Sequence, residues 1–174
     1  MWGVTIVAFT IGSVFGGAAV TALMGLFGAA ALGGEPTSIW LAASAALAAG
    51  VLDLTPLRPW TPRRQVNEDW IGRYRGWVYG AGFGLQLGVG FAVFVMSWGY
   101  WAMLLISFLT ASPAAGALTG AVFGLGRGLL LYLSRTNTTP ESLGRFHERM
   151  MRYKRPTFTA TAMMMVIVAL TSLI

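Results

Sequence analysis

The stretch Gly76-Trp-Val-Tyr-Gly80-Ala-Gly-Phe-Gly84-Leu-Gln-Leu-Gly88 decides the fold, because it places a glycine at every fourth position of a long apolar segment. A second row of the same kind consists of Gly116, Gly120, Gly124 and Gly128. In a water-soluble helix, each interior glycine would cost about 1 kcal/mol relative to alanine. In a bilayer, such glycines let two helix backbones approach closely, and that contact drives helix association. The two rows therefore predict an all-α polytopic membrane protein with glycine-lined packing faces.

The composition agrees with this class. Of the 174 residues, 56% are hydrophobic and only 10% are charged, whereas about a quarter of a globular domain is charged. The length allows about five or six spans of ~20 residues each and leaves no room for a separate soluble domain. We therefore expect residues 1–174 to form a single transmembrane domain. The absence of cysteine excludes disulfides, thiolate metal sites and thiol redox chemistry.

The net charge of +6 comes from cations that gather in two segments between the apolar stretches. These segments, 55–75 and 134–155, together hold Arg58, Arg63, Arg64, Arg73, Arg75, Arg135, Arg145, Arg149, Arg152, Lys154 and Arg155. Basic clusters beside membrane spans contact anionic lipid headgroups and set the orientation of the chain. We therefore expect a bilayer with anionic headgroups, and not nucleic acid, as the partner of these segments.

Apolar stretches and turn signals predict six spans, of which the first is interrupted at Gly12, Gly16 and Gly17. Residues 98–133 would be about 54 Å long as one helix, which exceeds the ~30 Å hydrocarbon core. Thr110-Ala111-Ser112-Pro113 breaks this region, since proline removes a backbone donor. The expected spans are 4–32, 39–54, 76–96, 101–112, 114–133 and 157–174.

The two basic segments resemble each other. Thr61-Pro62 precedes Arg73-Tyr74-Arg75, and Thr139-Pro140 precedes Arg152-Tyr153-Lys154, at nearly the same spacing. In each segment the threonine fits a helix N-cap and the proline fits the first helical position. The pattern predicts two amphipathic helices that lie in the membrane interface.

This likeness suggests an internal repeat with two halves, about 1–97 and 98–174. Three spans in each half would make the repeat inverted, an architecture typical of small transporters. Six spans place the two basic segments on opposite sides of the membrane. Five spans remain an alternative, because the positive-inside rule prefers both segments on one side.

The stretch Phe108-Leu-Thr-Ala-Ser-Pro113-Ala-Ala-Gly116-Ala-Leu-Thr-Gly-Ala-Val122 is similar to the broken fourth span of the cytochrome c biogenesis and thiol-disulfide interchange family (the CcdA/DsbD type). The transmembrane domain of that family has two three-span halves, each beginning with a helix broken at a proline–cysteine motif. Residues 9–16 resemble the first-span counterpart, without its proline. Both family cysteines are missing, and Ala114 stands at the place of one. The resemblance therefore implies a retained scaffold in a bacterial cytoplasmic membrane, without redox activity.

Two charged residues lie within or beside the expected spans. Arg127 is the only cation inside an apolar span, where an unpaired charge costs roughly 2.5–3.5 kcal/mol on insertion scales. Asp53, near the end of the second span, is its candidate partner. Two simpler interpretations stay open, because Arg127 can snorkel to the interface and Asp53 can cap a neighbouring helix.

Gln86 lies mid-span in the first glycine row, where an unpaired amide costs several kcal/mol. It either bonds a backbone carbonyl at a helix contact or lines a substrate pocket. Ser13, Thr110 and Ser112 are candidates for the same pocket, since broken helices expose free carbonyl and amide groups. The simpler alternative is that such hydroxyls bond carbonyls of their own helix.

The chain shows no serine–histidine–acid, paired-carboxylate or phosphate-loop pattern, so we do not expect an enzyme. His147 has no second histidine or cysteine with which to bind a metal. Met163, Met164 and Met165 point in different directions around a helix, which favours packing over copper binding. No metal or cofactor is therefore expected.

Two functions fit these observations. The repeat and the broken spans favour a small transporter-like protein that moves or binds a weakly polar solute. The glycine rows and the missing catalytic constellation also fit a non-catalytic accessory or assembly subunit, which would contact other membrane subunits or further copies of itself.

Overall fold

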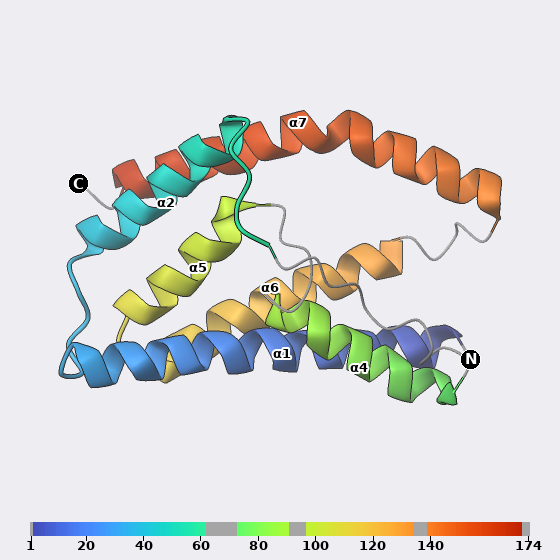
Figure 1. Ribbon diagram of the computed structural model, residues 1–174, viewed down its shortest axis with the longest axis horizontal. Coiled ribbons are helices and arrows are strands. Elements are labelled where there is room, and N and C mark those ends of the chain that lie inside the picture. Colours follow the sequence, from blue (N-terminus) through green and yellow to red (C-terminus); the bar gives the residue numbers. More distant parts are fainter. Residues whose placement is uncertain (1, 62–72, 91–96, 134–138, 172–174) are drawn as a thin grey trace.

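The computed structural model describes residues 2–61, 73–90, 97–133 and 139–171. Helices form all the regular secondary structure of these residues, so the all-α prediction is confirmed for them. The helices are α1 (Trp2–Ala31), α2 (Ile39–Leu54), α4 (Gly76–Val89), α5 (Trp98–Leu109), α6 (Pro113–Leu133) and α7 (Pro140–Thr171). In Figure 1, α4 and α6 lie along α1, while α2 lies beside α7.

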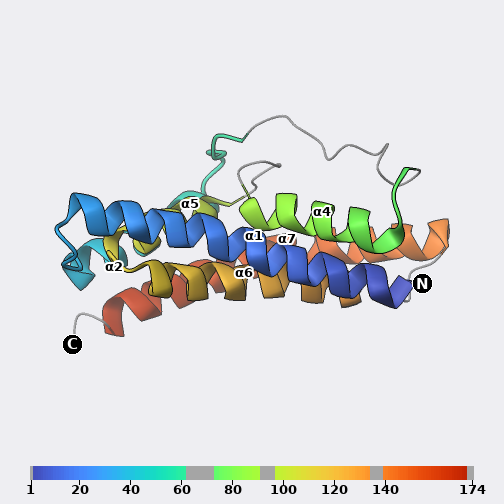
Figure 2. The same ribbon diagram turned by 90° about the horizontal axis from the view of Figure 1, so that it is seen from below.

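Helix α1 is the centre of the packing, and both glycine rows lie against it. A Cβ atom built on Gly84 would overlap the carbonyl oxygen of Phe9, and one built on Gly124 would overlap that of Ser13. Glycines of α1 make the same kind of contact: Gly12 lies against the α4 backbone, and Gly17 lies against the α6 backbone. Figure 2 shows α1 between these two helices. The three helices therefore touch through their main chains.

The glycine contacts also fix the helix directions. On α4 they pair Gly80 with Thr5, Gly84 with Phe9 and Gly88 with Ser13, so α4 runs parallel to α1. On α6 they pair Gly116 with Thr21, Gly120 with Gly17 and Gly124 with Ser13, so α6 runs antiparallel to α1. Since Ser13 takes part in both series, α4 and α6 meet α1 at the same level.

Helix α5 continues in the direction of α4 instead of reversing it. The cluster of Tyr100 and Leu104 packs against Val20 and Met24 of α1. Farther along, Gly28 of α1 lies against the carbonyl group of Phe108. Together α4 and α5 follow α1 from its beginning to its end. Six alternating spans would require α4 and α5 to point in opposite directions, so the structure departs from that expectation here.

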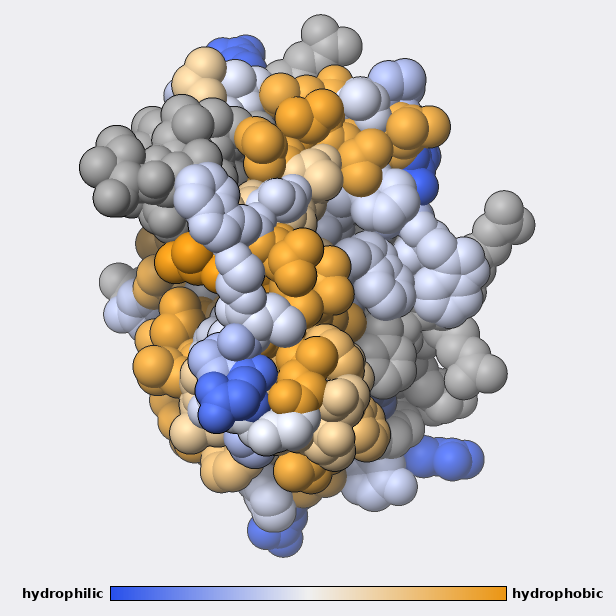
Figure 3. All heavy atoms as spheres, turned by 90° about the vertical axis from the view of Figure 1, so that its left-hand side faces the viewer, coloured by the Kyte–Doolittle hydropathy of each residue, from blue (hydrophilic) through white to orange (hydrophobic). Residues whose placement is uncertain are grey.

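Large apolar side chains lie on the outside of the molecule and small residues lie inside. The buried residues of α6 are its four row glycines, whereas its exposed side chains include Leu118, Val122, Leu125, Leu129, Leu130 and Leu133. Figure 3 faces the end of the molecule near the C-terminus of α1 and shows apolar residues over much of it. By length and composition, α1 and α6 are able to cross a bilayer, while α2 and α5 are apolar but shorter.

Two sequence predictions about helix ends are wrong. The first span is not interrupted at Gly12–Gly17, because α1 is continuous over 30 residues. These glycines contact neighbouring main chains, and that packing offsets the loss of helix stability that an interior glycine causes. The second basic segment is not a separate interfacial helix. It forms one 32-residue helix with the last span, with Pro156 inside it.

Other predictions about helix ends are confirmed. The turn at 110–112 separates α5 from α6. Thr139 precedes α7, and its hydroxyl oxygen accepts a hydrogen bond from the amide of Ser142 (3.2 Å). The amide of Thr139 in turn donates to the hydroxyl of Ser142 (3.0 Å), which closes a reciprocal cap. The expected first interfacial helix lies mainly at 62–72, outside the described residues.

Two glycines of α6 offer a matched test of this packing. Gly124→Ala should destabilise the protein by about 1–3 kcal/mol, because the new methyl group meets the main chain of Ser13. Gly126→Ala has nothing within 4 Å of its Cβ and should be neutral or stabilising by up to about 1 kcal/mol. Thermal unfolding in detergent, followed by size-exclusion fluorescence, measures both. Equal melting temperatures for the two variants would contradict the close contact.

Candidate functional site

Two described helix ends, the end of α4 and the start of α5, are held by side chains of other segments. Helix α4 ends at Val89, and its C-cap Gly90 adopts a φ of 75°, a left-handed conformation that favours glycine. A Cβ atom at this position would also collide with the ring of Tyr100. The hydroxyl of Tyr100 donates a hydrogen bond to the carbonyl oxygen of Val89. The α5 side chain thus satisfies one of the carbonyl groups left open where α4 stops.

The start of α5 is held by a carboxylate from another helix. Asp53, near the end of α2, accepts hydrogen bonds from the Ser97 hydroxyl (2.7 Å), the Trp98 amide (2.7 Å) and the Gly99 amide (3.4 Å). An acidic group at a helix N-terminus satisfies open amides and complements the helix dipole. The indole of Trp98 adds a bond to the carbonyl oxygen of Leu57 (3.1 Å). Asp53 therefore caps a neighbouring helix, the simpler of its two interpretations.

Arg127 of α6 is linked to the end of α4 only indirectly, through two aromatic rings. Its guanidinium carbon lies 4.8 Å from the ring centre of Phe123, and the ring of Phe123 lies 5.7 Å from that of Tyr100. A continuous series of contacts thus leads from Arg127 to the end of α4 at Val89. Arg127 is half-buried. Since Asp53 bonds the start of α5, the two charges have different neighbours and the proposed Arg127–Asp53 pair is not formed.

The four polar residues assigned to a substrate pocket are not brought together. Thr110 and Ser112 lie at the α5–α6 turn, where the Thr110 hydroxyl donates to the Ser107 carbonyl (2.7 Å) and the Ser112 hydroxyl accepts from the Ala115 amide (3.3 Å). Ser13 lies on α1, at the level where both α4 and α6 contact this helix. Gln86 is two residues beyond Gly84 and therefore points about 200° away from the face on α1.

Most other hydroxyls of the apolar helices bond carbonyls of their own helix, as the simpler alternative holds. Four bonds of this kind, each spanning four residues, belong to Thr10, Thr21, Ser107 and Thr119. Ser13 is the exception, because its fully buried hydroxyl has no hydrogen-bond partner within the described structure. The interior of the bundle thus presents few polar groups, and a site must be built from helix ends.

The sequence predicted a break at residues 97–100, between the expected spans 76–96 and 101–112, and it was interpreted as a membrane interface between two crossings. The structure places the end of α4 earlier, at Val89, with Gly90 as its C-cap. Gly90 gave no clear signal because glycine is frequent throughout the apolar stretches. Asp53 was recognised as a candidate, but its partner, the start of α5, follows only from the fold.

No group of three or more histidine, cysteine, aspartate or glutamate side chains gathers as a metal site within the described residues. No protein-family model, curated protein or solved structure matches this chain. The resemblance to the cytochrome c biogenesis type of membrane domain therefore stays a prediction.

The cap on α5 can be tested by substitution at Asp53. Asp53→Ala should lower stability by about 0.5–2 kcal/mol, because it leaves the Trp98 amide without its acceptor, while the Gly99 amide keeps the Ser97 hydroxyl (3.0 Å). Asp53→Asn keeps one acceptor oxygen and should lose less, and Glu35→Ala, at an exposed turn, serves as the control. Thermal unfolding in detergent measures the order of stability of these three variants. If adding Arg127→Gln to Asp53→Ala restored the stability, Asp53 would be the partner of Arg127 and not a cap.

Proposed function

We propose that this chain is an integral membrane protein that crosses the bilayer five times. The crossings are α1, α2, the pair α4–α5, α6 and α7. This count follows from the parallel directions of α4 and α5, whose 14 and 12 helical residues span together about 39 Å. It replaces two inverted three-span halves, which need α4 and α5 to cross separately.

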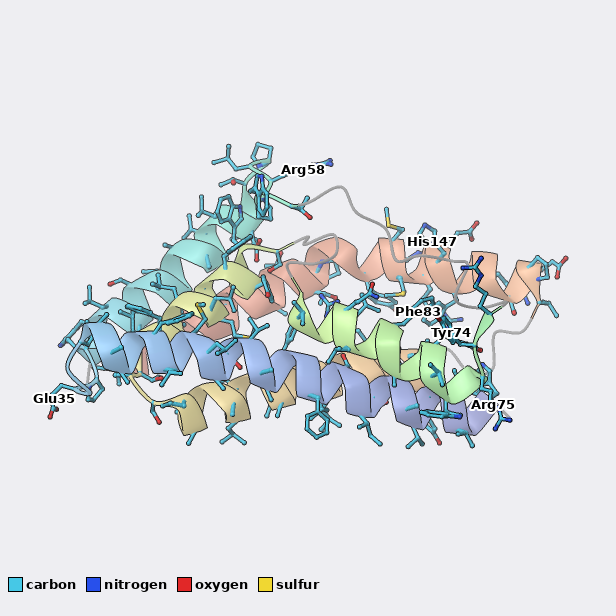
Figure 4. All side chains as sticks on the ribbon, turned by 60° about the horizontal axis from the view of Figure 1, so that its bottom comes forward. Glu35, Arg58, Tyr74, Arg75, Phe83 and His147 are labelled. Atoms are coloured by element: carbon cyan, nitrogen blue, oxygen red, sulfur yellow. The ribbon has the colours of Figure 1, made fainter. Side chains whose placement is uncertain are left out.

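The charge distribution supports the five-crossing topology. In Figure 4, Arg75 and His147 lie toward one end of the molecule and Glu35 lies at the other, with Arg58 between them beyond the end of α2. Eleven of the 12 cations belong to the two basic segments, and five crossings put both segments on one side. The connections at 32–38 and 110–112 contain no lysine or arginine. The positive-inside rule then assigns both basic segments to the cytoplasmic face.

The lack of native cysteine permits a clean test of this topology. Single-cysteine variants Arg64→Cys and Arg145→Cys should react with a membrane-impermeant maleimide only after the cells are permeabilised. Glu35→Cys should react in intact cells. Labelling of Arg64→Cys and Arg145→Cys from opposite sides would restore the six-span arrangement.

Within this topology, the protein acts as a small carrier that binds a weakly polar solute where α4 gives way to α5. One observation carries this proposal: α4 and α5 are consecutive helices with the same direction, and Tyr100 bonds the end of α4 while Asp53 caps the start of α5. Transporters commonly bind solutes at discontinuous helices, because half-helix ends offer main-chain groups and dipoles inside the membrane. The described interior offers few other polar groups, so it can satisfy only a weakly polar solute.

A second candidate is a non-catalytic accessory subunit of a larger membrane complex. The observation in its favour is that most polar groups of the described interior are already satisfied within the bundle. Four hydroxyls bond carbonyls of their own helices, and the main chains contact each other through glycine. These groups do not require a bound solute as a hydrogen-bond partner. In that case the exposed apolar faces of α1 and α6 contact neighbouring subunits as well as lipid.

Reconstituted vesicles separate the two functions. A carrier should increase the flux of a radiolabelled solute from a panel of small amides, alcohols and organic acids above that of empty vesicles. Thr119→Ala, at an exposed position on α6, should transport normally. Tyr100→Phe should transport more slowly, because it removes the α5 hydroxyl that bonds the Val89 carbonyl at the end of α4. An accessory subunit should show no flux for any solute and should co-purify with other chains at a fixed stoichiometry in mild detergent.

A further inference from the structure

Among the described residues, the fully buried hydroxyl side chains are those of Ser13, Thr21 and Ser107. Two of them bond carbonyl groups of their own helices, since Thr21 donates to the Gly17 oxygen (2.8 Å) and Ser107 donates to the Met103 oxygen (2.8 Å). The hydroxyl of Ser13 has no hydrogen-bond partner among the described residues. A buried hydroxyl in this state has lost its bonds to water without replacement, so it is available to a ligand.

The direction of the Ser13 side chain follows from its neighbours along α1. Gly12 and Gly16 lie against the main chain of α4, whereas Gly17 lies against that of α6. At about 100° per residue, Gly12 and Gly16 are about 100° and about 60° to one side of Ser13, and Gly17 is about 40° to the other side. Since α4 and α6 also contact each other, Ser13 points into the wedge that these two helices form with α1.

This wedge lies beside the last turn of α4. Gly88 of α4 and Gly124 of α6 both pack on the carbonyl group of Ser13, and α4 ends one residue after Gly88, at Val89. A site at Ser13 therefore adjoins the end of α4, where the proposed carrier binds its solute.

The described form of the bundle closes the wedge. Ser13 has no exposed surface, so a solute reaches its hydroxyl only after α4 moves away from α1. The α4 face suits such a movement, because Gly80, Gly84 and Gly88 insert no side chains into α1. The unpaired hydroxyl raises the free energy of the closed form, and a solute that bonds it favours the open form.

We propose that Ser13 binds the solute in the wedge between α4 and α6 when α4 separates from α1. This inference rests on the proposed carrier function and names the chemical class of its solute. A serine hydroxyl is uncharged and both donates and accepts hydrogen bonds, but a single hydroxyl cannot compensate the desolvation of an ion. The solute is therefore a small neutral molecule with an amide, carbonyl or hydroxyl group, and acetamide is a suitable probe.

Two matched serine variants test the unpaired hydroxyl. Ser13→Ala removes a hydroxyl without a partner and should raise the melting temperature by about 2–4 °C. Ser107→Ala, at an equally buried helical serine, removes a hydroxyl that bonds Met103 and should leave the melting temperature unchanged or lower it. Thermal unfolding in detergent measures both. Equal shifts in the two variants, or a lower melting temperature for Ser13→Ala than for the wild-type chain, overturn the inference.

Cysteine modification tests the opening, because the chain contains no native cysteine. Ser13→Cys and Thr21→Cys place thiols at two fully buried positions, of which Thr21 packs against Gly116 and Gly120 of α6. In nanodiscs, the small neutral reagent methyl methanethiosulfonate should modify Ser13→Cys at least tenfold faster, because movement of α4 uncovers Ser13 and leaves Thr21 covered. A single symmetric elution peak establishes that both variants are folded. Equal rates at the two positions overturn the inference.

Binding of acetamide is measured separately from transport, as the change in melting temperature when acetamide is added. Acetamide should raise the melting temperatures of the wild-type chain and Ser107→Ala relative to that of Ser13→Ala, because a bound solute stabilises the folded protein. The same change in all three proteins overturns the inference.

Flux of radiolabelled acetamide into vesicles separates this inference from the carrier function. The wild-type chain and Ser107→Ala should transport at similar rates, and Ser13→Ala should lose at least tenfold of the protein-dependent flux. Full flux in Ser13→Ala would leave the carrier standing and remove the site at Ser13. Ser13-dependent binding of acetamide without flux of any solute would keep the site and remove the carrier function.

Discussion

The main-chain contact of α1 with α4 and α6 is the constraint on which the rest of the structure depends. Lipid tails are as apolar as leucine, so no hydrophobic drive brings helices together inside a bilayer. Dispersion between closely placed atoms and weak Cα–H···O contacts take over that role. Both fall off within a fraction of an ångström, and a Cβ atom at Gly84 or Gly124 would prevent them. The carbonyl group of Ser13 meets glycines of both neighbours, Gly88 and Gly124, so three main chains are joined at one level.

A core of this kind determines where polar chemistry can occur. The glycine faces of α4 and α6 carry no side chains into their contacts with α1, and helical hydroxyls such as those of Thr10 and Thr21 bond carbonyls of their own helix. Apart from the buried hydroxyl of Ser13, polar groups of the described bundle become available mainly where a helix stops. Helix α4 ends at Val89, with Gly90 as its C-cap, and α5 starts after Ser97. Tyr100 bonds the end of α4, and Asp53 caps the start of α5.

Much of the fold could be predicted from the sequence because the signals were local. The glycine rows identified the contacting faces, the Thr110–Pro113 turn separated α5 from α6, and Thr139 marked the start of α7. Features that depend on packing between helices could not be predicted from such local signals. Taken alone, Gly12, Gly16 and Gly17 look like breaks in α1. They lie in a continuous helix because the main chain of α4 or α6 packs on each of the three. Pro156 likewise stays within α7, where the hydroxyl of Thr157 bonds the Tyr153 carbonyl (2.7 Å), as happens when side chains re-satisfy a proline-disturbed turn. The pairing of Asp53 with α5 required knowledge of which helices are neighbours.

The placement of the two charges also depends on the start of α5. A carboxylate is best used where open amide groups converge, and the start of α5 offers three donors to Asp53. Once these donors are satisfied, Asp53 has little to gain from moving to Arg127, and the cost of leaving the α5 amides open opposes such a move. The cap that stabilises the start of α5 therefore also keeps the Asp53 carboxylate away from Arg127, whose guanidinium group lies on the ring of Phe123. The two opposite charges serve separate contacts, because the open amides at a helix start compete with a guanidinium group on another helix for the same carboxylate.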